Sequence, residues 1–432
     1  MHTAVQLPMD RPHKAIRRLR VRLIGLLFGL CGFSAVMADA GAELKDRPPS
    51  HSESIVSVRA VYDGAMTPDE AVSTFRHIDR LFPTRTIAHG PRVFALPPAT
   101  KPVNNIHFQS NGRSWDLYDY LAVNRVAGLL VLKNGRVALE QYQYGNTANT
   151  HWMSMSVAKS ITSTLIAVAL KDGAIHSIDD AVTQYVSELK GSAYDGVSIR
   201  DLLCMSSGVR WNETYTDTTS DRRKLLDIQI GQEPGAALAL MRSLPRAAPP
   251  GTVNNYNTGE TLVAGEVVHR AVHMPLSTYF SQRIWQPFGM EADASWWLAS
   301  ADGIEIAGSG FSATLRDYGR FGLFFLNDGV MNGQSILPNG WRTQASSRQR
   351  LKTGTIMDYG YFWWPATPTT DTPEPGDAFL AEGIFGQFLY INPREQVVIV
   401  AWGARSKPEG MDIINDQDAF AAIAHSLHDA PP

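Results

Sequence analysis

The sequence predicts an α/β (α+β) fold in which a central antiparallel sheet is flanked by helices and carries an inserted helical lobe. Strand-like apolar runs occur near residues 128–142 and again at 387–402, and helical patterns dominate between them. Separate domains would each need a complete core, so the distant strands must build one sheet. No internal repeat points to a solenoid or a propeller.

The first 38 residues are typical of an export signal. Six basic residues precede an apolar run at 23–38, which ends in small residues. The run is shorter than the roughly 20 residues of a membrane-spanning helix. We expect a cleaved signal peptide at 1–38, a periplasmic or secreted protein, and no stable membrane span after cleavage. An uncleaved N-terminal anchor is the alternative.

Charge and cysteine usage narrow the class of protein further. Loss of residues 1–38 removes six basic residues and one acidic residue, and it leaves a net charge of −8. An acidic chain disfavours nucleic acid as a partner. Cys31 lies in the signal, so Cys204 stands alone and no internal disulfide is expected. Its apolar neighbours indicate a core thiol.

Two regions follow the signal. Residues 39–110 are rich in proline and polar residues and contain one helical stretch at 67–81, and we interpret them as an extension packed on the main domain. The main domain, 111–432, opens with two β-type runs around Lys133-Asn134-Gly135, where Asn-Gly predicts a tight hairpin. The helical lobe covers about 160–295.

The remaining elements follow from apolar spacing and capping residues. A helix is predicted from Met155 to Leu170, because apolar residues recur there at intervals of three and four. Further helices are predicted at 179–189, 198–205, 258–271, 277–287, 314–326 and 416–427, and strands at 359–364, 387–393 and 396–402.

Ser156 and Lys159 stand at the first turn of the helix predicted from Met155. Residues three apart lie on one face of a helix, so the two side chains can meet. A desolvated, neutral lysine amine can take the proton of a serine hydroxyl, and the helix N-terminus favours the anion that develops. Ser-x-x-Lys occurs by chance in long chains, so this spacing alone also fits a capping serine beside a solvated lysine.

Further segments lie downstream in an order that gives the pair a context. They are Leu202-Leu-Cys-Met-Ser-Ser-Gly-Val-Arg-Trp211, Asn255-Tyr-Asn-Thr-Gly259, Gly308-Ser-Gly-Phe-Ser-Ala-Thr-Leu-Arg-Asp-Tyr318 and Gly383-Ile-Phe-Gly-Gln387. With these motifs, residues 110–425 resemble the serine β-lactamase and penicillin-binding-protein superfamily. The resemblance is narrower to the class C β-lactamase-related hydrolases, a group with esterases, D-amino-acid amidases and 6-aminohexanoate-dimer hydrolases.

The resemblance implies a β-lactamase/transpeptidase-like fold and a set of site residues. Ser156 corresponds to the nucleophile and Lys159 to its lysine. Tyr256, in Tyr-x-Asn, corresponds to the tyrosine that shuttles protons. Which of Lys159 and Tyr256 is the base stays open. A tyrosine buried only for structure is the alternative for Tyr256.

The third motif of the family, Lys-Thr-Gly or His-Thr-Gly, has two candidate positions. Lys352-Thr353-Gly354 matches literally, but it precedes the strand predicted at 359–364. The family order favours Ala381-Glu382-Gly383, which makes Glu382 and Gly383 candidate substrate contacts. The backbone amides of Ser156 and Ile384 would then form the oxyanion hole.

Three further residues bear on the substrate. Thr258 stands where the pattern has asparagine, and Ala381 stands where it has the cation that anchors β-lactam carboxylates. These departures disfavour β-lactam turnover. Tyr215 lies where 6-aminohexanoate-dimer hydrolases carry a substrate-side tyrosine, and an ordinary exposed loop tyrosine is an equal alternative.

These observations predict a serine hydrolase that cleaves a small-molecule ester or amide through an acyl-enzyme on Ser156. Only His151 among the histidines lies near a motif, so neither a metal nor an organic cofactor is expected. The oligomeric state stays open. Two alternatives remain, namely a true β-lactamase or D,D-peptidase, and a catalytically silent envelope binding protein of the same fold.

Overall fold

The computed structural model describes residues 53–369 and 375–428. The chain divides into Met1–His51 and one compact unit, Ser52–Pro432. The predicted signal peptide, 1–38, lies outside the described residues. In the described ranges, no helix has both the length and the apolar character needed to cross a membrane.

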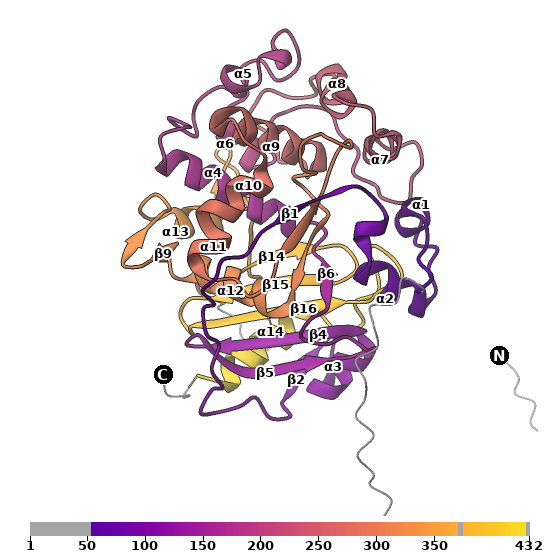
Figure 1. Cartoon of the computed structure of the whole chain (residues 1–432), viewed down its shortest axis with the longest axis vertical. Coiled ribbons are helices and arrows are strands. Elements are labelled where there is room, and N and C mark those ends of the chain that lie inside the picture. Colours follow the sequence, from indigo (N-terminus) through magenta and orange to yellow (C-terminus); the bar gives the residue numbers. More distant parts are fainter. Residues whose placement is uncertain (1–52, 370–374, 429–432) are drawn as a thin grey trace, which may run out of the picture. The chain divides into compact units, whose positions relative to one another are not determined.

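A six-stranded antiparallel sheet forms the base of the compact unit (Figure 1). Its strands, in spatial order, are β13 (Trp364–Pro365), β14 (Phe379–Gly383), β15 (Gln387–Asn392), β16 (Val397–Gly403), β4 (Val126–Lys133) and β5 (Arg136–Tyr142). The C-terminal strand β16 pairs with the N-terminal strand β4, with Val400 opposite Leu130. The predicted assembly of one sheet from distant segments is therefore confirmed.

The hairpin between β4 and β5 has the two-residue turn that its sequence predicts. Lys133 pairs with Arg136, and the two turn residues, Asn134 and Gly135, have φ values of 51° and 73°. Positive φ at both positions matches the right-handed twist of the flanking strands, and Asn-Gly tolerates it at low cost.

A second, four-stranded sheet lies between the main sheet and the lobe. Its order is β1 (Thr84–Ile87), β7 (Ala294–Trp297), β8 (Phe311–Thr314) and β6 (His151–Met153). This sheet was not expected from the sequence. Its strand β1 comes from the region 39–110, so that region contributes to the core.

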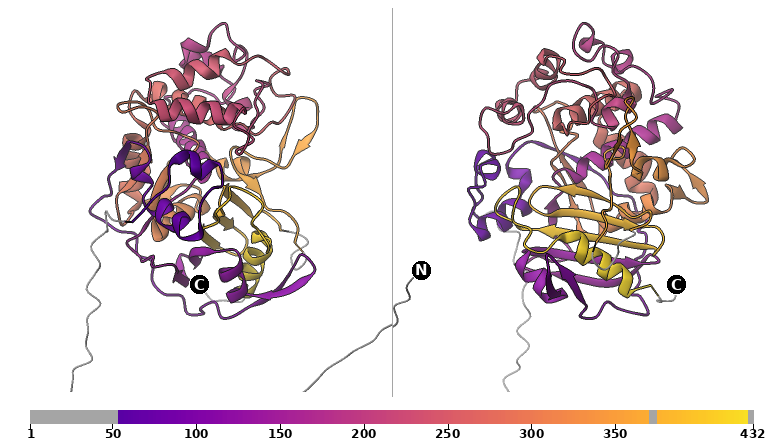
Figure 2. Two further views of the ribbon diagram at one scale, coloured as in Figure 1. Left: turned by 90° about the vertical axis from the view of Figure 1, so that its right-hand side faces the viewer. Right: turned by 180° about the vertical axis from the view of Figure 1, so that it is seen from behind.

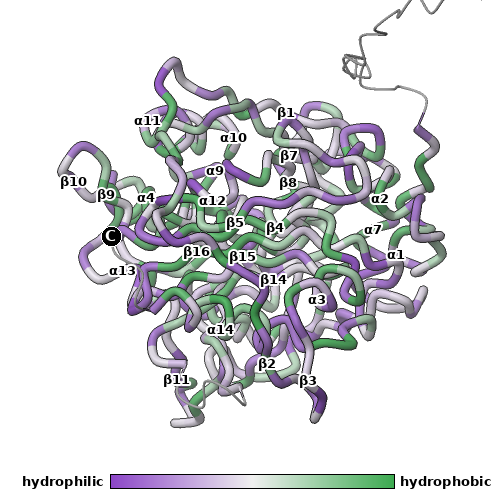
Figure 3. Tube along the Cα trace, turned by 90° about the horizontal axis from the view of Figure 1, so that it is seen from below, coloured by the Kyte–Doolittle hydropathy of each residue, from purple (hydrophilic) through white to green (hydrophobic). Residues whose placement is uncertain are grey.

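Helices cover both faces of the main sheet (Figure 2). Helix α12 (Leu315–Leu326) packs on β16, β15 and β4, and α14 (Asp416–Ser426) covers the opposite face. Alternate residues of β16 face opposite sides of the sheet. Val398 and Val400 belong to the hydrophobic core on the side of α12, and Val397 and Ile399 belong to the core on the side of α14. Burial on both faces explains why the strand is continuously apolar, and Figure 3 shows hydrophobic segments along β15, β16 and β4.

The lobe is built around α4 (Val157–Lys171) and α9 (Thr258–Val272), which pack on each other. The other lobe helices are α5 (Val182–Tyr185), α6 (Ile199–Leu203), α7 (Asp221–Gly231), α8 (Ala236–Ser243), α10 (Leu276–Phe280) and α11 (Gln286–Phe288). The remaining elements are α1 (Val58–Tyr62), α2 (Pro68–Arg76), β2 (His107–Ser110), β3 (Arg113–Asp116), α3 (Leu117–Val123), β9 (Val330–Met331), β10 (Gln334–Ser335), α13 (Trp341–Ser346), β11 (Gln349–Arg350) and β12 (Ile356–Met357).

Three predicted elements were wrong in extent. The helical stretch predicted at 67–81 is α2, which ends at Arg76, followed by a 3₁₀ turn at Ile78–Arg80. The helix predicted at 179–189 is a short α5 followed by a 3₁₀ turn at Ser187–Leu189. The strand predicted at 359–364 exists only from Trp364. In this segment Phe362 has a φ of 59°, and its amide bonds to Leu203 O rather than to a strand. The segment is rich in aromatic residues because it is buried in the core, although its backbone is irregular.

We predict that Gly322→Ala destabilises the fold by about 1–3 kcal/mol, because the new Cβ would lie 2.5 Å from Val398 Cγ1 and push α12 off the sheet. Urea unfolding measures the change. The matched control is Gly231→Ala at the end of α7, where a Cβ meets nothing within 4 Å. There the change should be neutral or stabilising by up to about 1 kcal/mol. Equal effects of the two substitutions would contradict the packing argument.

Candidate active site

Ser156 lies at the point where β6 leads into α4. It is the N-cap of α4, and Met155 before it has a φ of 42°. The first turn is tight, since the Val157 amide bonds to Ser154 O at 3.2 Å and the Lys159 amide bonds to Ser156 O at 3.0 Å. The strained connection holds Ser156 at the positive end of a helix, where developing negative charge is favoured.

Lys159 is buried against Ser156. Its Nζ lies 2.8 Å from Ser156 Oγ and 3.1 Å from Gly308 O, and the residue is 2% exposed. Burial lowers the pKa of Lys159 to about 7, although the charge of Glu213 acts in the opposite direction. Near neutral pH a large share of this amine is therefore uncharged and able to accept a proton.

Tyr256 completes the group from the residue before Asn257, the N-cap of α9. Lys159 Nζ lies 5.1 Å from the centroid of its ring. The ring stacks on Trp364 at 5.8 Å and meets Tyr359 edge-on at 6.2 Å. Burial raises the pKa of Tyr256 well above its usual value, and a hydrogen bond with Ser156 partly opposes this. The phenol is therefore protonated at neutral pH and can donate a proton.

Strand β14 brings Ala381-Glu382-Gly383 to the serine. A Cβ on Gly383 would lie 2.6 Å from Ser154 O and 2.9 Å from Ser156 N, so only glycine fits this close approach. Lys352-Thr353-Gly354 lies instead between β11 and β12. There Lys352 pairs with Asp201 at 3.3 Å and remains largely exposed.

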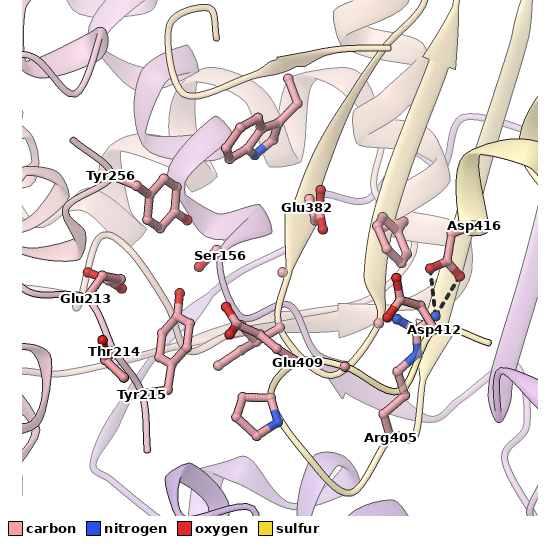
Figure 4. Close-up of a pocket in the computed structure, with 17 residues that line it drawn as sticks. Ser156, Glu213, Thr214, Tyr215, Tyr256, Glu382, Arg405, Glu409, Asp412 and Asp416 are labelled. Carbon is pink, nitrogen blue, oxygen red and sulfur yellow. Dashed lines mark hydrogen bonds and ion pairs between the residues drawn. The ribbon is translucent and has the colours of Figure 1, made fainter. Parts of the chain in front are cut away.

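A cavity of about 610 Å³ opens over Ser156. The sequence-predicted residues Tyr215, Tyr256, Glu382, Gly383 and Ile384 all line it with Ser156. Figure 4 shows Ser156 between Tyr256 on one side and Glu382 and Glu409 on the other. Ile384 comes directly after Gly383, where the chain turns from β14 toward β15.

Tyr215 is not an ordinary exposed loop tyrosine. It is 8% exposed, and its ring lies 6.4 Å from that of Tyr62. Arg223 Nη1 donates a hydrogen bond to its carbonyl oxygen at 3.1 Å. The tyrosine is thus fixed in the cavity wall.

Glu213 is a lining residue that sequence analysis missed. Trp211 Nε1 donates to its carboxylate at 2.5 Å, and the amide and hydroxyl of Thr258 donate at 2.9 Å and 2.5 Å. Thr258, which replaces the asparagine of the family pattern, therefore anchors this carboxylate. Its position in the sequence could have indicated this role, because Glu213 lies two residues before Tyr215, in a segment that the family resemblance had already singled out.

Trp364, Arg405, Glu409 and Asp412 also line the cavity without having been predicted. Trp364 ends the aromatic run at 359–364, which we had interpreted as a strand. The other three come from the connection between β16 and α14. Polar residues in a connecting segment carry no periodic signal, so only the fold places them beside Ser156.

Other reactive residues lie apart from this cavity. Cys204 is buried, and burial raises its pKa to about 12, which makes it a poor nucleophile. His151 contacts Asp293 O at 2.7 Å. Within the described ranges, no group of three or more His, Cys, Asp or Glu side chains is arranged to hold a metal ion.

Comparison with known proteins defines the family. The family model described as Beta-lactamase matches residues 122–423, so the chain belongs to the beta-lactamase family, a family of hydrolases. The resemblance inferred from the motifs is confirmed.

Individual relatives agree with this assignment. The chain is 27% identical to the 6-aminohexanoate-dimer hydrolase of Paenarthrobacter ureafaciens over 78% of its own length and 86% of the relative. A Bacillus anthracis structure assigned as a 6-aminohexanoate-dimer hydrolase matches at a TM-score of 0.70 with 24% identity, covering 84% of this chain and 96% of that one. A family VIII carboxylesterase matches at 0.56 with 16% identity, covering 73% and 96%. These structures confirm the predicted fold.

We predict that kcat/KM for an ester rises with pH through a midpoint near 7, because Lys159 accepts a proton only when neutral. Lys159→Arg should lose at least about 10³-fold at every pH, since a guanidinium stays protonated. The control is Lys171→Arg, an exposed lysine at the end of the same helix. A pH profile flat between 6 and 8 would contradict a lysine pKa near 7.

We also predict that Gly383→Ala abolishes turnover while Lys352→Ala changes it by less than about threefold. The alanine Cβ would collide with the backbone around Ser156, whereas Lys352 lies outside the cavity. Steady-state ester hydrolysis measures both variants, and circular dichroism checks folding. Loss of activity in Lys352→Ala would indicate instead that Lys352-Thr353-Gly354 is the third motif of the family in this chain.

Proposed function

We propose that the protein is a serine hydrolase that cleaves an ester or amide bond through an acyl-enzyme on Ser156. The observation that carries the proposal is the 2.8 Å contact between Ser156 Oγ and the buried, low-pKa amine of Lys159. A lysine kept only for structure gains little from burial against a hydroxyl, because desolvation of its charge is costly. A proton-accepting amine needs this environment.

The reaction has two steps. Ser156 Oγ attacks the carbonyl carbon while its proton passes to the neutral amine of Lys159, either directly or through Tyr256, which would give its own phenolic proton to the amine. The amides of Ser156 and Ile384 stabilise the oxyanion. Collapse of the tetrahedral intermediate breaks the bond to the leaving group, which takes up a proton through Tyr256. Water then attacks the acyl carbon, the bond to Ser156 Oγ breaks, the carboxylic acid leaves, and the serine regains its proton.

An ester or small amide fits the cavity better than a β-lactam. Ala381 is fully buried and offers no cation for a substrate carboxylate. The relative from Paenarthrobacter ureafaciens is named as a hydrolase of the 6-aminohexanoate dimer, and the carboxylesterase shares the fold. We also propose export through the segment 1–38, which N-terminal sequencing of the protein from its native host would test.

We predict that a fluorophosphonate probe labels Ser156, as read by peptide mapping. Ser156→Ala should lose labelling and at least about 10³-fold in ester turnover. The matched control is Ser163→Ala in the same helix, whose buried hydroxyl has no hydrogen-bond partner among the described residues and whose removal should leave labelling intact.

Labelling at another serine, or no labelling in a folded sample, would contradict the proposal. Absence of labelling would favour the catalytically silent binding protein. A chromogenic cephalosporin offered beside a p-nitrophenyl ester separates the remaining alternative, since efficient cephalosporin turnover would favour a β-lactamase.

A further inference from the structure

The cavity over Ser156 carries an unbalanced charge. Its lining holds five carboxylates and one guanidinium. The carboxylates belong to Glu213, Glu382, Glu409, Asp412 and Asp416. Carboxylates alone would not identify a ligand, but these share a cavity with the proposed nucleophile, so whatever substrate enters must meet them.

The guanidinium of Arg405 is not available to an incoming anion. Arg405 Nη2 contacts both carboxylate oxygens of Asp416 at 2.7 Å, and the residue is 8% exposed. Its Nε lies beneath Gly386, 2.7 Å from the position of a Cβ there. The charges of Arg405 and Asp416 therefore cancel, and the other charged residues of the lining are all acidic.

Three carboxylates remain free on one wall, which we call the acidic wall: Glu382, Glu409 and Asp412. In the described part of the chain, none of them forms an ion pair or hydrogen bond with another residue. Lys407, from the same segment, does not line the cavity, and its side chain packs against Gly64.

The carboxylates of this wall disfavour each other. Glu382 is the exposed residue of β14, and its side chain lines the cavity, where it is partly desolvated. This desolvation raises the pKa of Glu382 to about 7. The charges of Asp416, Asp412 and Glu409 contribute to this rise, while Arg405 acts in the opposite direction. A cation bound beside Glu382 would relieve this repulsion.

The opposite side of the cavity places no fixed positive charge against a cation. Tyr256 and Trp364 line it with uncharged aromatic rings, which stack on each other. Lys159 does not line the cavity and is only partly charged near neutral pH, because burial lowers its pKa to about 7. No described cation other than Arg405 lines the cavity.

We propose that the acidic wall is a subsite for an ammonium group, so that the enzyme selects substrates carrying a cationic amine and excludes substrates that present a carboxylate there. This inference rests on the proposed function, because it names the substrate class of the same site.

Competitive inhibition of p-nitrophenyl acetate hydrolysis by three six-carbon probes tests the proposal. Hexylammonium should bind at least about 10-fold more tightly than 1-hexanol, and hexanoate should bind most weakly. Two variants remove charge from the acidic wall: the double variant Glu409→Gln/Asp412→Asn, at two exposed positions, and the single variant Glu382→Gln. In each of them, the preference for hexylammonium over 1-hexanol should fall to about threefold or less. Raising the salt concentration should also reduce it.

Glu233→Gln is the control, because it removes one exposed carboxylate from a different cavity and should keep the full preference. Equal binding of the three probes, tighter binding of hexanoate, or a preference that survives in both wall variants would overturn the proposal. Calorimetric titration of the three probes into Ser156→Ala gives the same comparison without turnover. Loss of the charge preference is therefore distinguishable from failure of the hydrolase mechanism.

Discussion

Burial of an amine against a hydroxyl is the interaction on which the rest of this structure depends. An ammonium ion in an apolar interior is costly, so Lys159 is kept there only because the surrounding chain fixes it. Helix α4 supplies both partners, and the carbonyl of Gly308 accepts a hydrogen bond from the amine. Helix α4 contacts α9 of the lobe and β14 of the main sheet, and Lys159 is buried between them.

The second sheet explains how a short strand can set the geometry. Strand β6 has only three residues, but β8 holds it along its length, with Trp152 opposite Ala313. Trp152 also stacks on Trp402 of β16, with ring centroids 5.6 Å apart. The turn at Met155 is therefore fastened to both sheets, so its unfavourable backbone conformation is maintained by packing on either side.

Much of this arrangement could be predicted from the chain alone. Asn134-Gly135 defined the hairpin, apolar spacing defined α4 and α9, and the order of motifs brought Ser156, Lys159, Tyr256 and Gly383 to one place. The second sheet escaped prediction, because strands of three or four residues have no readable period. Glu409 and Asp412 escaped for another reason, since nothing local distinguishes a carboxylate facing a cavity from one facing solvent.

The pairing of β16 with β4 has a consequence for how the chain acquires its structure. The two strands are more than 260 residues apart, so the loop between them must close before the sheet exists. Contacts of such separation make folding slow relative to local helix formation. The lobe, in which α4 and α6 both contact α9 within a continuous stretch of chain, can gain structure earlier. The cavity over Ser156, which needs β14 and the connection after β16, can be completed only when these C-terminal segments join the sheet.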